Sequence, residues 1–182
     1  MAMSLTKRGC KLSTHINARA EMDGEDPVPA CDFTIHGMLL DGDELGELMN
    51  EPSIHNRWFN IKAKPVEPWG ARKIAAYALC DKFEGAGVRL FLDGATSMTL
   101  KSCKLKNLRL EPQTGGLTNL SLTVQYRASA DEIAVLYTHQ GLDISASLQF
   151  GRVAKSAKAQ PQLPLDHLGP NEVPGPLDEQ QT

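Results

Sequence analysis

The strongest constraint on the fold lies between residues 96 and 150, where apolar and polar side chains alternate along several segments. Residues 120–126 alternate Leu, Leu, Val and Tyr with Ser, Thr and Gln, and residues 142–150 alternate in the same way. A period of two predicts strands with one buried face. Along residues 98–110 the apolar side chains switch twice from one face of the predicted strand to the other. In a regular strand such a one-residue slip would place the apolar side chains in solvent. We therefore expect a long, bulged strand there, followed by a turn at Gly115-Gly116.

Two capping boxes predict short helices. Ser129 with Glu132 opens a helix that we expect to end near Gly141, and Asp41 with Glu44 opens another before Pro52. In each box the first side chain accepts a hydrogen bond from the backbone N–H three residues later. The glutamate side chain closes the reciprocal bond. Both helices are amphipathic and are expected to lie against the core.

The remaining segments give further strands and a third helix. Residues 11–22 and 31–40 alternate and are expected to pair as a hairpin with a long loop. Residues 57–62 and 88–92 predict two shorter strands. Residues 71–83 carry apolar side chains at helical spacing and predict a helix.

These patterns predict a mainly β domain over residues 10–152, an antiparallel β-sandwich or distorted barrel of about six strands with two or three short helices. The hydrophobic fraction of 41% is ordinary for such a domain. Residues 153–182 hold five prolines and few large apolar side chains. They predict a flexible, Pro/Gln-rich acidic tail.

Composition and spacing also bear on location and chemistry. There is no run of about 18 apolar residues and no apolar signal-peptide core, so we expect a cytoplasmic protein that does not span a membrane. The four cysteines are widely spaced and without C-x-x-C, which predicts buried or half-buried thiols in a reducing compartment.

No motif of catalysis or metal binding is present. The five histidines and four cysteines show neither H-x-x-x-H nor C-x-x-C spacing, and Cys31 and His36 would lie on opposite faces of a strand. The chain has no G-x-S-x-G, Walker loop or G-x-G-x-x-G. We therefore expect no enzyme, no cofactor and no metal.

Charge is distributed unevenly. The net charge is −3, but residues 160–182 carry four acidic residues and no Lys or Arg, so residues 1–159 have a net charge of +1. Basic residues crowd the N-terminal strand and the long strand, and two tryptophans lie in an irregular stretch between them. If the two strands lie close together, their outward faces form a basic patch. The tryptophans lie in irregular surroundings where an aromatic ring could stack on a base. The candidate nucleic-acid-binding residues are Lys101, Lys104, Lys106, Arg109, Lys11, Arg19, Trp58 and Trp69.

A second interpretation of the same residues is structural. Lysines on solvated strand faces discourage edge-to-edge aggregation, and tryptophans usually lie in the core. The two interpretations differ in whether the cations lack acidic partners and whether the rings are exposed.

Two resemblances bear on function. A strand-rich core with a Pro/Gln-rich segment and an acidic end resembles the layout of bacterial single-stranded-DNA-binding proteins, although this chain ends Leu-Asp-Glu-Gln-Gln-Thr without their acidic Pro-Phe tip. Residues 30–150 are similar to uncharacterised proteins encoded in bacteriophage early regions. The segments that carry this second resemblance are Leu39-Leu40-Asp41 through Leu45, Phe83-Glu84-Gly85-Ala86, Ser102-Cys103-Lys104-Leu105, Gly115-Gly116 and Val124-Gln125.

The second resemblance implies a small phage protein that works beside recombination or anti-defence genes and has no known catalytic residues. We therefore expect a non-enzymatic phage binding protein in the host cytoplasm that acts in nucleic-acid transactions, through single-stranded DNA or as a recombination accessory. One alternative is an inhibitor that binds a host anti-phage defence protein. A second is a virion structural component, which would assemble as a homo-oligomer.

Overall fold

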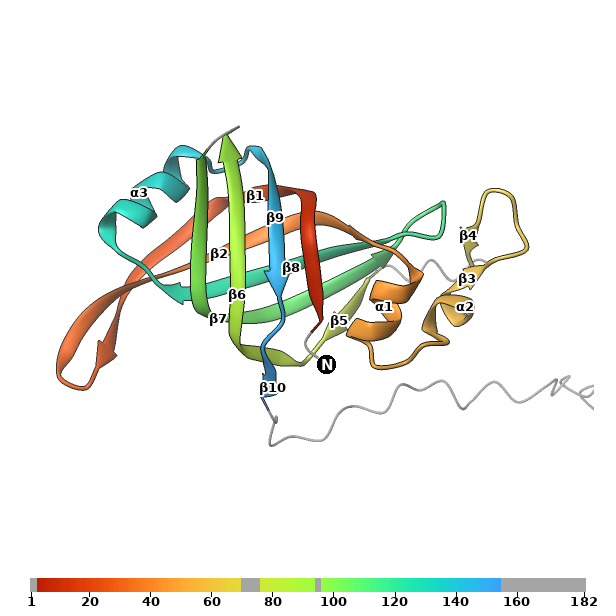
Figure 1. Ribbon diagram of the computed structural model, residues 1–182, viewed down its shortest axis with the longest axis horizontal. Helices are drawn as coiled ribbons and strands as arrows, with labels where there is room; N and C mark the ends of the chain where they lie inside the picture. The colour runs from red at the N-terminus through yellow and green to blue at the C-terminus, as the bar shows by residue number, and fades with distance from the viewer. Residues whose placement is uncertain (1–2, 70–75, 94–95, 155–182) are drawn as a thin grey trace, which may run out of the picture.

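The computed structural model describes residues 3–69, 76–93 and 96–154, which form thirteen elements of secondary structure (Figure 1). Ten are strands and three are short helices. The elements are β1 (Ser4–Asp23), β2 (Asp26–Leu40), α1 (Gly42–Leu48), α2 (Ile54–Trp58), β3 (Phe59–Asn60), β4 (Glu67–Pro68), β5 (Tyr77–Leu79), β6 (Lys82–Asp93), β7 (Thr96–Pro112), β8 (Thr118–Arg127), α3 (Ala130–Thr138), β9 (Asp143–Gln149) and β10 (Arg152–Ala154).

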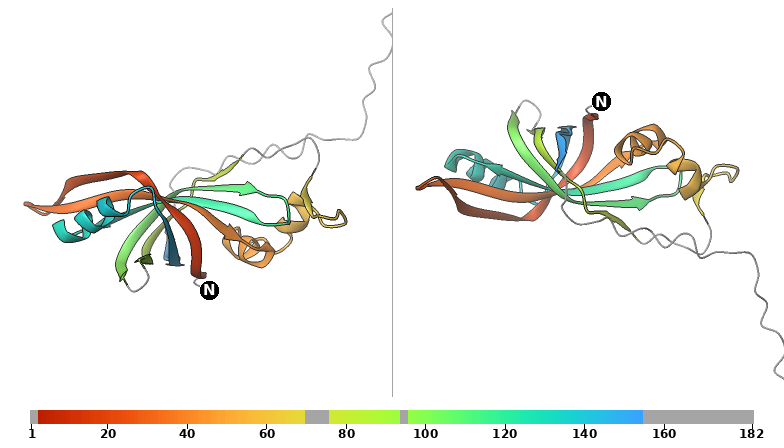
Figure 2. Two further views of the ribbon diagram at one scale, coloured as in Figure 1. Left: turned by 90° about the horizontal axis from the view of Figure 1, so that it is seen from above. Right: turned by 90° about the horizontal axis from the view of Figure 1, so that it is seen from below.

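Eight of the strands form one antiparallel sheet in the order β10-β6-β9-β1-β2-β8-β7-β5. An additional pairing of β6 with β7 closes six of these strands into a ring. The mainly β class and the short helices predicted from the sequence are confirmed. The ring is not an even barrel, because its long strands bend and change neighbours along their length. Figures 1 and 2 show β6 and β9 crossing the direction of β2 and β8 steeply.

Bulges produce these bends. The pairing register of β1 shifts between Leu5 and Arg8 against β9, and again between Leu12 and Ile16 against β2. In β7, Ser102 and Asn107 have positive φ angles of 58° and 54°, and the register shifts beside each. The bulges predicted for residues 98–110 are therefore confirmed. Each adds an unpaired residue that bends its strand.

The inward faces of the ring strands form a single apolar core. Alternate residues of β8, from Thr118 to Tyr126, are buried, as the period of two predicts. Leu136 of α3 and Leu45 of α1 are fully buried against this core. Figure 1 shows α3 at one end of the molecule and α1 and α2 at the other. No helix in the described part of the chain is long and apolar enough to cross a membrane.

Both predicted capping boxes are confirmed. Glu44 N–H donates to Asp41 Oδ1 at 2.9 Å, and Glu132 N–H donates to Ser129 Oγ at 3.2 Å. The reciprocal bonds to the glutamate side chains are also present. Each helix therefore begins at the residue that its capping box indicates.

The helix predicted for residues 71–83 is wrong where it can be compared. Residues 77–79 form β5 and residue 82 begins β6, whereas residues 71–75 lie outside the described residues. Tyr77 and Leu79 lie opposite Leu110 and Leu108 of β7. The segment whose apolar side chains have helical spacing thus forms strands, because pairing with β7 overrides a weak local preference for helix.

The predicted long hairpin loop and the strand predicted for residues 57–62 also need correction. β1 and β2 continue almost to the turn at Gly24, whose φ is 67°. Pro27 and Pro29 are tolerated there because β8 pairs with β2 only from Ala30 onward. Within residues 57–62 only Phe59–Asn60 is a strand, because the residues up to Trp58 belong to α2.

Two further predictions differ in detail. Val153 and Ala154, placed in the tail by the sequence, belong to β10 and pair with β6, and residues 155–182 lie outside the described residues. Three cysteines are buried free thiols, as expected, but Cys80 is exposed between β5 and β6.

Candidate nucleic-acid interface

Arg19 and Lys106, two of the predicted binding residues, belong to a neutral network on the outer face of the sheet. Both contact Asp32, at 2.8 Å and 2.9 Å. Arg19 also pairs with Glu21, and Gln125 bridges Lys106 and Glu21 through hydrogen bonds of 3.2 Å and 2.8 Å. Hydrogen bonds from Arg19 and Gln125 lower the pKa of Glu21 below its usual value. These five residues, which we call the polar network, contain two cations and two carboxylates, so their charges cancel.

Two other predicted cations, Lys104 and Arg109, pair with carboxylates, whereas Lys11 forms no ion pair within 4.0 Å with the described side chains. Lys104 is 3.5 Å from Glu84, and Arg109 is 2.8 Å from Glu111. Lys11 is exposed and lies opposite Asp143 in the pairing of β1 with β9. Such pairs contribute little to stability in solvent, but they reduce the positive potential that a phosphate would meet.

Of the two tryptophans proposed for base stacking, Trp58 is buried and Trp69 is exposed. Trp58 is only 8% exposed and packs against Tyr77, with ring centroids 5.7 Å apart. Trp69 is 51% exposed, and its Nε1–H donates to the carbonyl oxygen of Asn56 at 3.1 Å. It follows β4, which Figure 1 shows at one end of the molecule, away from the central strands β6 and β9.

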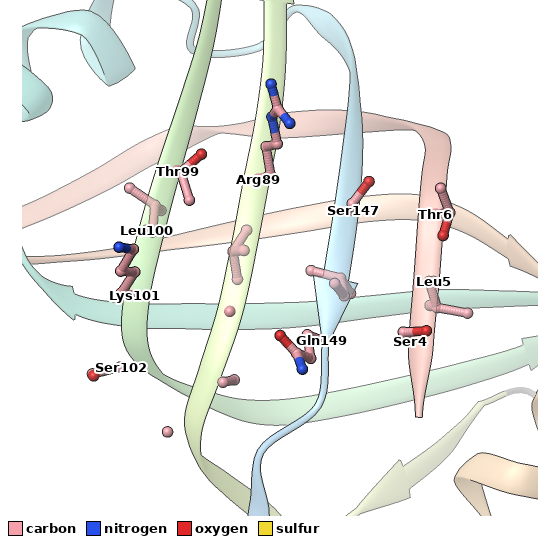
Figure 3. Close-up of a pocket in the computed structure, with 15 residues that line it drawn as sticks. Ser4, Leu5, Thr6, Arg89, Thr99, Leu100, Lys101, Ser102, Ser147 and Gln149 are labelled. Atoms are coloured by element: carbon pink, nitrogen blue, oxygen red, sulfur yellow. The ribbon is translucent and has the colours of Figure 1, made fainter. Parts of the chain in front are cut away.

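Lys101 lies in a different setting, a groove of about 580 Å³ that crosses β7, β6, β9 and β1 (Figure 3). Figure 3 shows Arg89 on β6 between Thr99 on β7 and Ser147 on β9. Arg89 and Lys101 are the charged lining residues, and no Asp, Glu, His or Cys is among them. We call this surface the basic groove. It is lined by Ser4, Leu5, Thr6, Gly85, Ala86, Gly87, Val88, Arg89, Thr99, Leu100, Lys101, Ser102, Ser147, Leu148 and Gln149.

Bulges and glycines explain why the sheet is hollowed at this place. Gly85 has a φ of 70°, which favours glycine, and the register of β6 against β7 shifts on both sides of Ala86. Ser102 is the bulged residue of β7 at the same level. Gly87 places no side chain over β6, and a Cβ added there would lie 3.5 Å from the side chain of Gln149. Bent strands and missing side chains together leave an open groove between polar rims.

At one end of the basic groove the lining residue Arg89 shares a single aromatic ring with Lys7, which is not itself a lining residue. Lys7 Nζ lies 5.3 Å from the centroid of Phe91, and the guanidinium carbon of Arg89 lies 5.0 Å from it. Arg89 Nη2 also donates to Ser97 Oγ at 3.3 Å. We call Lys7 and Arg89 the cation pair. The half-buried Phe91 attracts both charges through its ring electrons and fixes them near each other.

A bulge in β1 presents Lys7 to this ring. Its φ is 41°, and the pairing with β9 shifts between Leu5 and Arg8, so that two residues of β1 face Ser147. The backbone N–H of Lys7 donates to Ser147 Oγ at 2.8 Å. With the described side chains, none of Lys7, Arg89 and Lys101 forms an ion pair within 4.0 Å. These are therefore three cations whose charge is available to an incoming anion.

Sequence reasoning found only part of this surface. Lys101 was a candidate and lines the groove, whereas Lys7, Arg89 and Phe91 were not candidates. A signal existed in residues 88–92, where Val88 and Leu90 point inward and Phe91 takes the outward phase beside Arg89. An aromatic residue on the solvent phase of a strand indicates a surface role.

The arrangement suits anion binding. Hydroxyl groups, an amide and two cations line the basic groove beside apolar side chains, so it can bind phosphate or carboxylate groups. Within the described residues, no group of three or more His, Cys, Asp or Glu side chains could hold a metal ion. The resemblance to phage early-region proteins stays a prediction, because no family model, curated protein or solved structure matches this chain.

Proposed function

We propose that this protein is a non-enzymatic binding protein for single-stranded nucleic acid and that the strand lies in the basic groove. The observation that carries the proposal is a set of three cations, Arg89 and Lys101 in the groove and Lys7 beside it, that form no ion pair with the described side chains. The lining residues of the groove include no carboxylate. Proteins that bind single strands without sequence preference use positively charged grooves that follow the backbone. In a phage setting the ligand would be DNA exposed during replication or recombination.

The groove is suited to a short length of backbone. Its polar lining consists of Ser, Thr and Gln side chains that can donate hydrogen bonds to phosphate oxygens, and glycines that permit close approach. The neutral polar network shares β1 and β7 with the groove, but none of its residues lines the groove and it adds no net charge. Three cations predict three phosphate contacts, so that log K falls with log salt with a slope of about −2 for a single strand.

Fluorescence anisotropy with a labelled oligothymidylate, measured from low to moderate salt, tests this. Lys101→Ala removes one contact and should change the slope from about −2 to about −1.4. The loss of affinity should be about eightfold at about 50 mM salt and about threefold at about 200 mM salt. Arg109→Ala is the matched control, because Arg109 lies on the same strand outside the groove and pairs with Glu111. Absence of binding at low salt contradicts the proposal.

A second candidate, inhibition of a host defence protein, is favoured by one observation. Ile61 and Trp69 are 53% and 51% exposed around the small β3–β4 sheet. Exposed apolar side chains of this kind often contact other proteins. A pull-down from host lysate, with and without nuclease, separates the candidates. A partner that is retained after nuclease and lost in an Ile61→Ser variant favours the inhibitor.

A further inference from the structure

We infer that the cation pair of Lys7 and Arg89 is a phosphate-binding subsite, and that the basic groove recognises the phosphates of its ligand and leaves the bases outside. The inference rests on the proposed function, because it names the chemical group that the same groove binds. It also predicts a wider ligand class. Any linear chain of phosphates should enter the groove, whether or not it carries bases.

The first support is the concentration of charge at the cation pair. Because Lys7 Nζ and the Arg89 guanidinium lie 5.3 Å and 5.0 Å from one centroid, the two charges are no more than about 10 Å apart. That separation is within about one Debye length at 0.1 M salt, so salt does not fully screen the repulsion between the two charges. No described carboxylate pairs with either, and a tetrahedral anion between them would relieve their repulsion.

The second support is a hydroxyl placed beside the cations. Ser147 Oγ accepts the hydrogen bond from the backbone N–H of Lys7, and Ser147 lines the basic groove. Its own hydroxyl hydrogen has no acceptor among the described residues, so it can donate to a phosphate oxygen. A bulge that presents a lysine and orients a serine at the same point is typical of a binding feature.

The third support is the absence of a free stacking surface. No Phe, Tyr or Trp is among the residues that line the groove. Phe91, at its end, is contacted by both cations. A base that stacked on this ring would have to displace Lys7 or Arg89, and the charges that attract the backbone would leave with them. Phe91 is therefore a positioning residue for the cation pair, and base stacking, worth about 1–3 kcal/mol per base elsewhere, is not used here.

Competition tests the inference. The protein is first bound to labelled oligothymidylate at low salt, and unlabelled oligodeoxyadenylate, inorganic polyphosphate and polyglutamate are then added separately. Oligodeoxyadenylate should compete as well as unlabelled oligothymidylate, within threefold. Polyphosphate should displace the label completely at a similar phosphate concentration. Polyglutamate, which offers charge without phosphate geometry, should require at least tenfold more.

Variants locate the subsite. Lys7→Ala and Arg89→Ala should each make the salt slope less steep by about 0.7, for both oligothymidylate and polyphosphate. Phe91→Leu keeps both charges but releases them from the ring, so we expect affinity to fall for both ligands by the same factor. Lys11→Ala is the control, because Lys11 lies on β1 as Lys7 does but neither lines the groove nor contacts Phe91. Unchanged melting temperatures establish that the variants are folded.

Each outcome decides one of the two proposals. Two results would show that the protein contacts the bases: oligothymidylate binds but polyphosphate fails to compete, or the affinities for oligodeoxyadenylate and oligothymidylate differ more than tenfold. Either result refutes the phosphate subsite and leaves the proposed function standing. Equal competition by polyglutamate also refutes the subsite. If polyphosphate binds through Lys7 and Arg89 but no oligonucleotide binds, the subsite stands and the proposed function fails. If neither ligand binds, both are wrong.

Discussion

Asp32 should be the most sensitive position of the polar network, and Asp32→Asn should lower stability by about 2 kcal/mol. Its side chain is only 18% exposed and contacts Arg19 and Lys106 at 2.8 Å and 2.9 Å. The asparagine keeps the shape and one acceptor but removes the charge that two cations share. Both cations then remain close together on a partly buried surface without a compensating carboxylate.

The loss of stability expected for Asp32→Asn lies between two limits. A hydrogen bond to a charged group contributes about 1.5–3 kcal/mol when it is sheltered, whereas an exposed ion pair contributes about 0–1 kcal/mol. Arg19 and Lys106 are each 26% exposed, so the network lies between these cases and the larger figure must be discounted for solvent. For a chain of this size, about 2 kcal/mol corresponds to a fall in melting temperature of about 4–8 °C.

Urea denaturation of a double-mutant cycle is the assay. Asp32→Asn, Lys106→Met and the double variant are compared with the parent protein, and the two changes should be less than additive because the residues are in direct contact. Glu111→Gln is the matched control, since Glu111 pairs with the well-exposed Arg109 and should change stability by less than about 0.5 kcal/mol. A loss below about 0.5 kcal/mol for Asp32→Asn, or strict additivity, refutes the reasoning.

Four further outcomes are expected. In the native protein only the exposed Cys80 should react rapidly with a thiol reagent, as counted by absorbance. Burial raises the pKa of Cys103 from 9.0 to about 12. Between these pH values the thiol ionises in the unfolded chain but not in the folded protein, so the melting temperature should fall as the pH rises. The fall should be less steep in Cys103→Ala. Ser129→Ala should lower stability by about 1 kcal/mol in urea titrations through loss of the cap of α3. Gly151→Ala should lower the melting temperature clearly, because the added Cβ would lie 1.9 Å from a β6 carbonyl oxygen, whereas Gly87→Ala should not.

The parts of the fold that the sequence predicted are those determined by local patterns. Alternation along residues 120–126 and the two capping boxes depend on neighbours within four residues, and the structure confirms them. The segment around Tyr77 and Leu79 was mistaken for a helix because its partner, β7, lies about 30 residues later in the chain. Closure of the ring depends on β6 pairing with β7 and β9 together, which no single segment indicates.

The candidate site was harder to predict because charge pairing depends on register. A count of cations includes Lys106 and Lys101 equally, but Asp32 of β2 reaches Lys106 of β7 across the one intervening strand, β8, and no described carboxylate pairs with Lys101. The cation pair requires a bulge at Lys7 that the alternation of β1 does not reveal. The pairing of the strands therefore decides which basic residues remain available to bind an anion, and the number of basic residues does not.

The closed ring also determines when the chain can fold during synthesis. Ser4 of β1 pairs with Gln149 of β9, so one edge of the first strand has no partner until about 145 more residues have been made. At about 5–20 residues per second this takes roughly 7–30 s, during which the unpaired backbone N–H and C=O groups of this edge are exposed to other nascent chains. Folding is then limited by contacts between distant segments, which are slow to form. Chains interrupted before β9 should be insoluble or bound to chaperones, whereas those that include β9 and β10 can close the sheet.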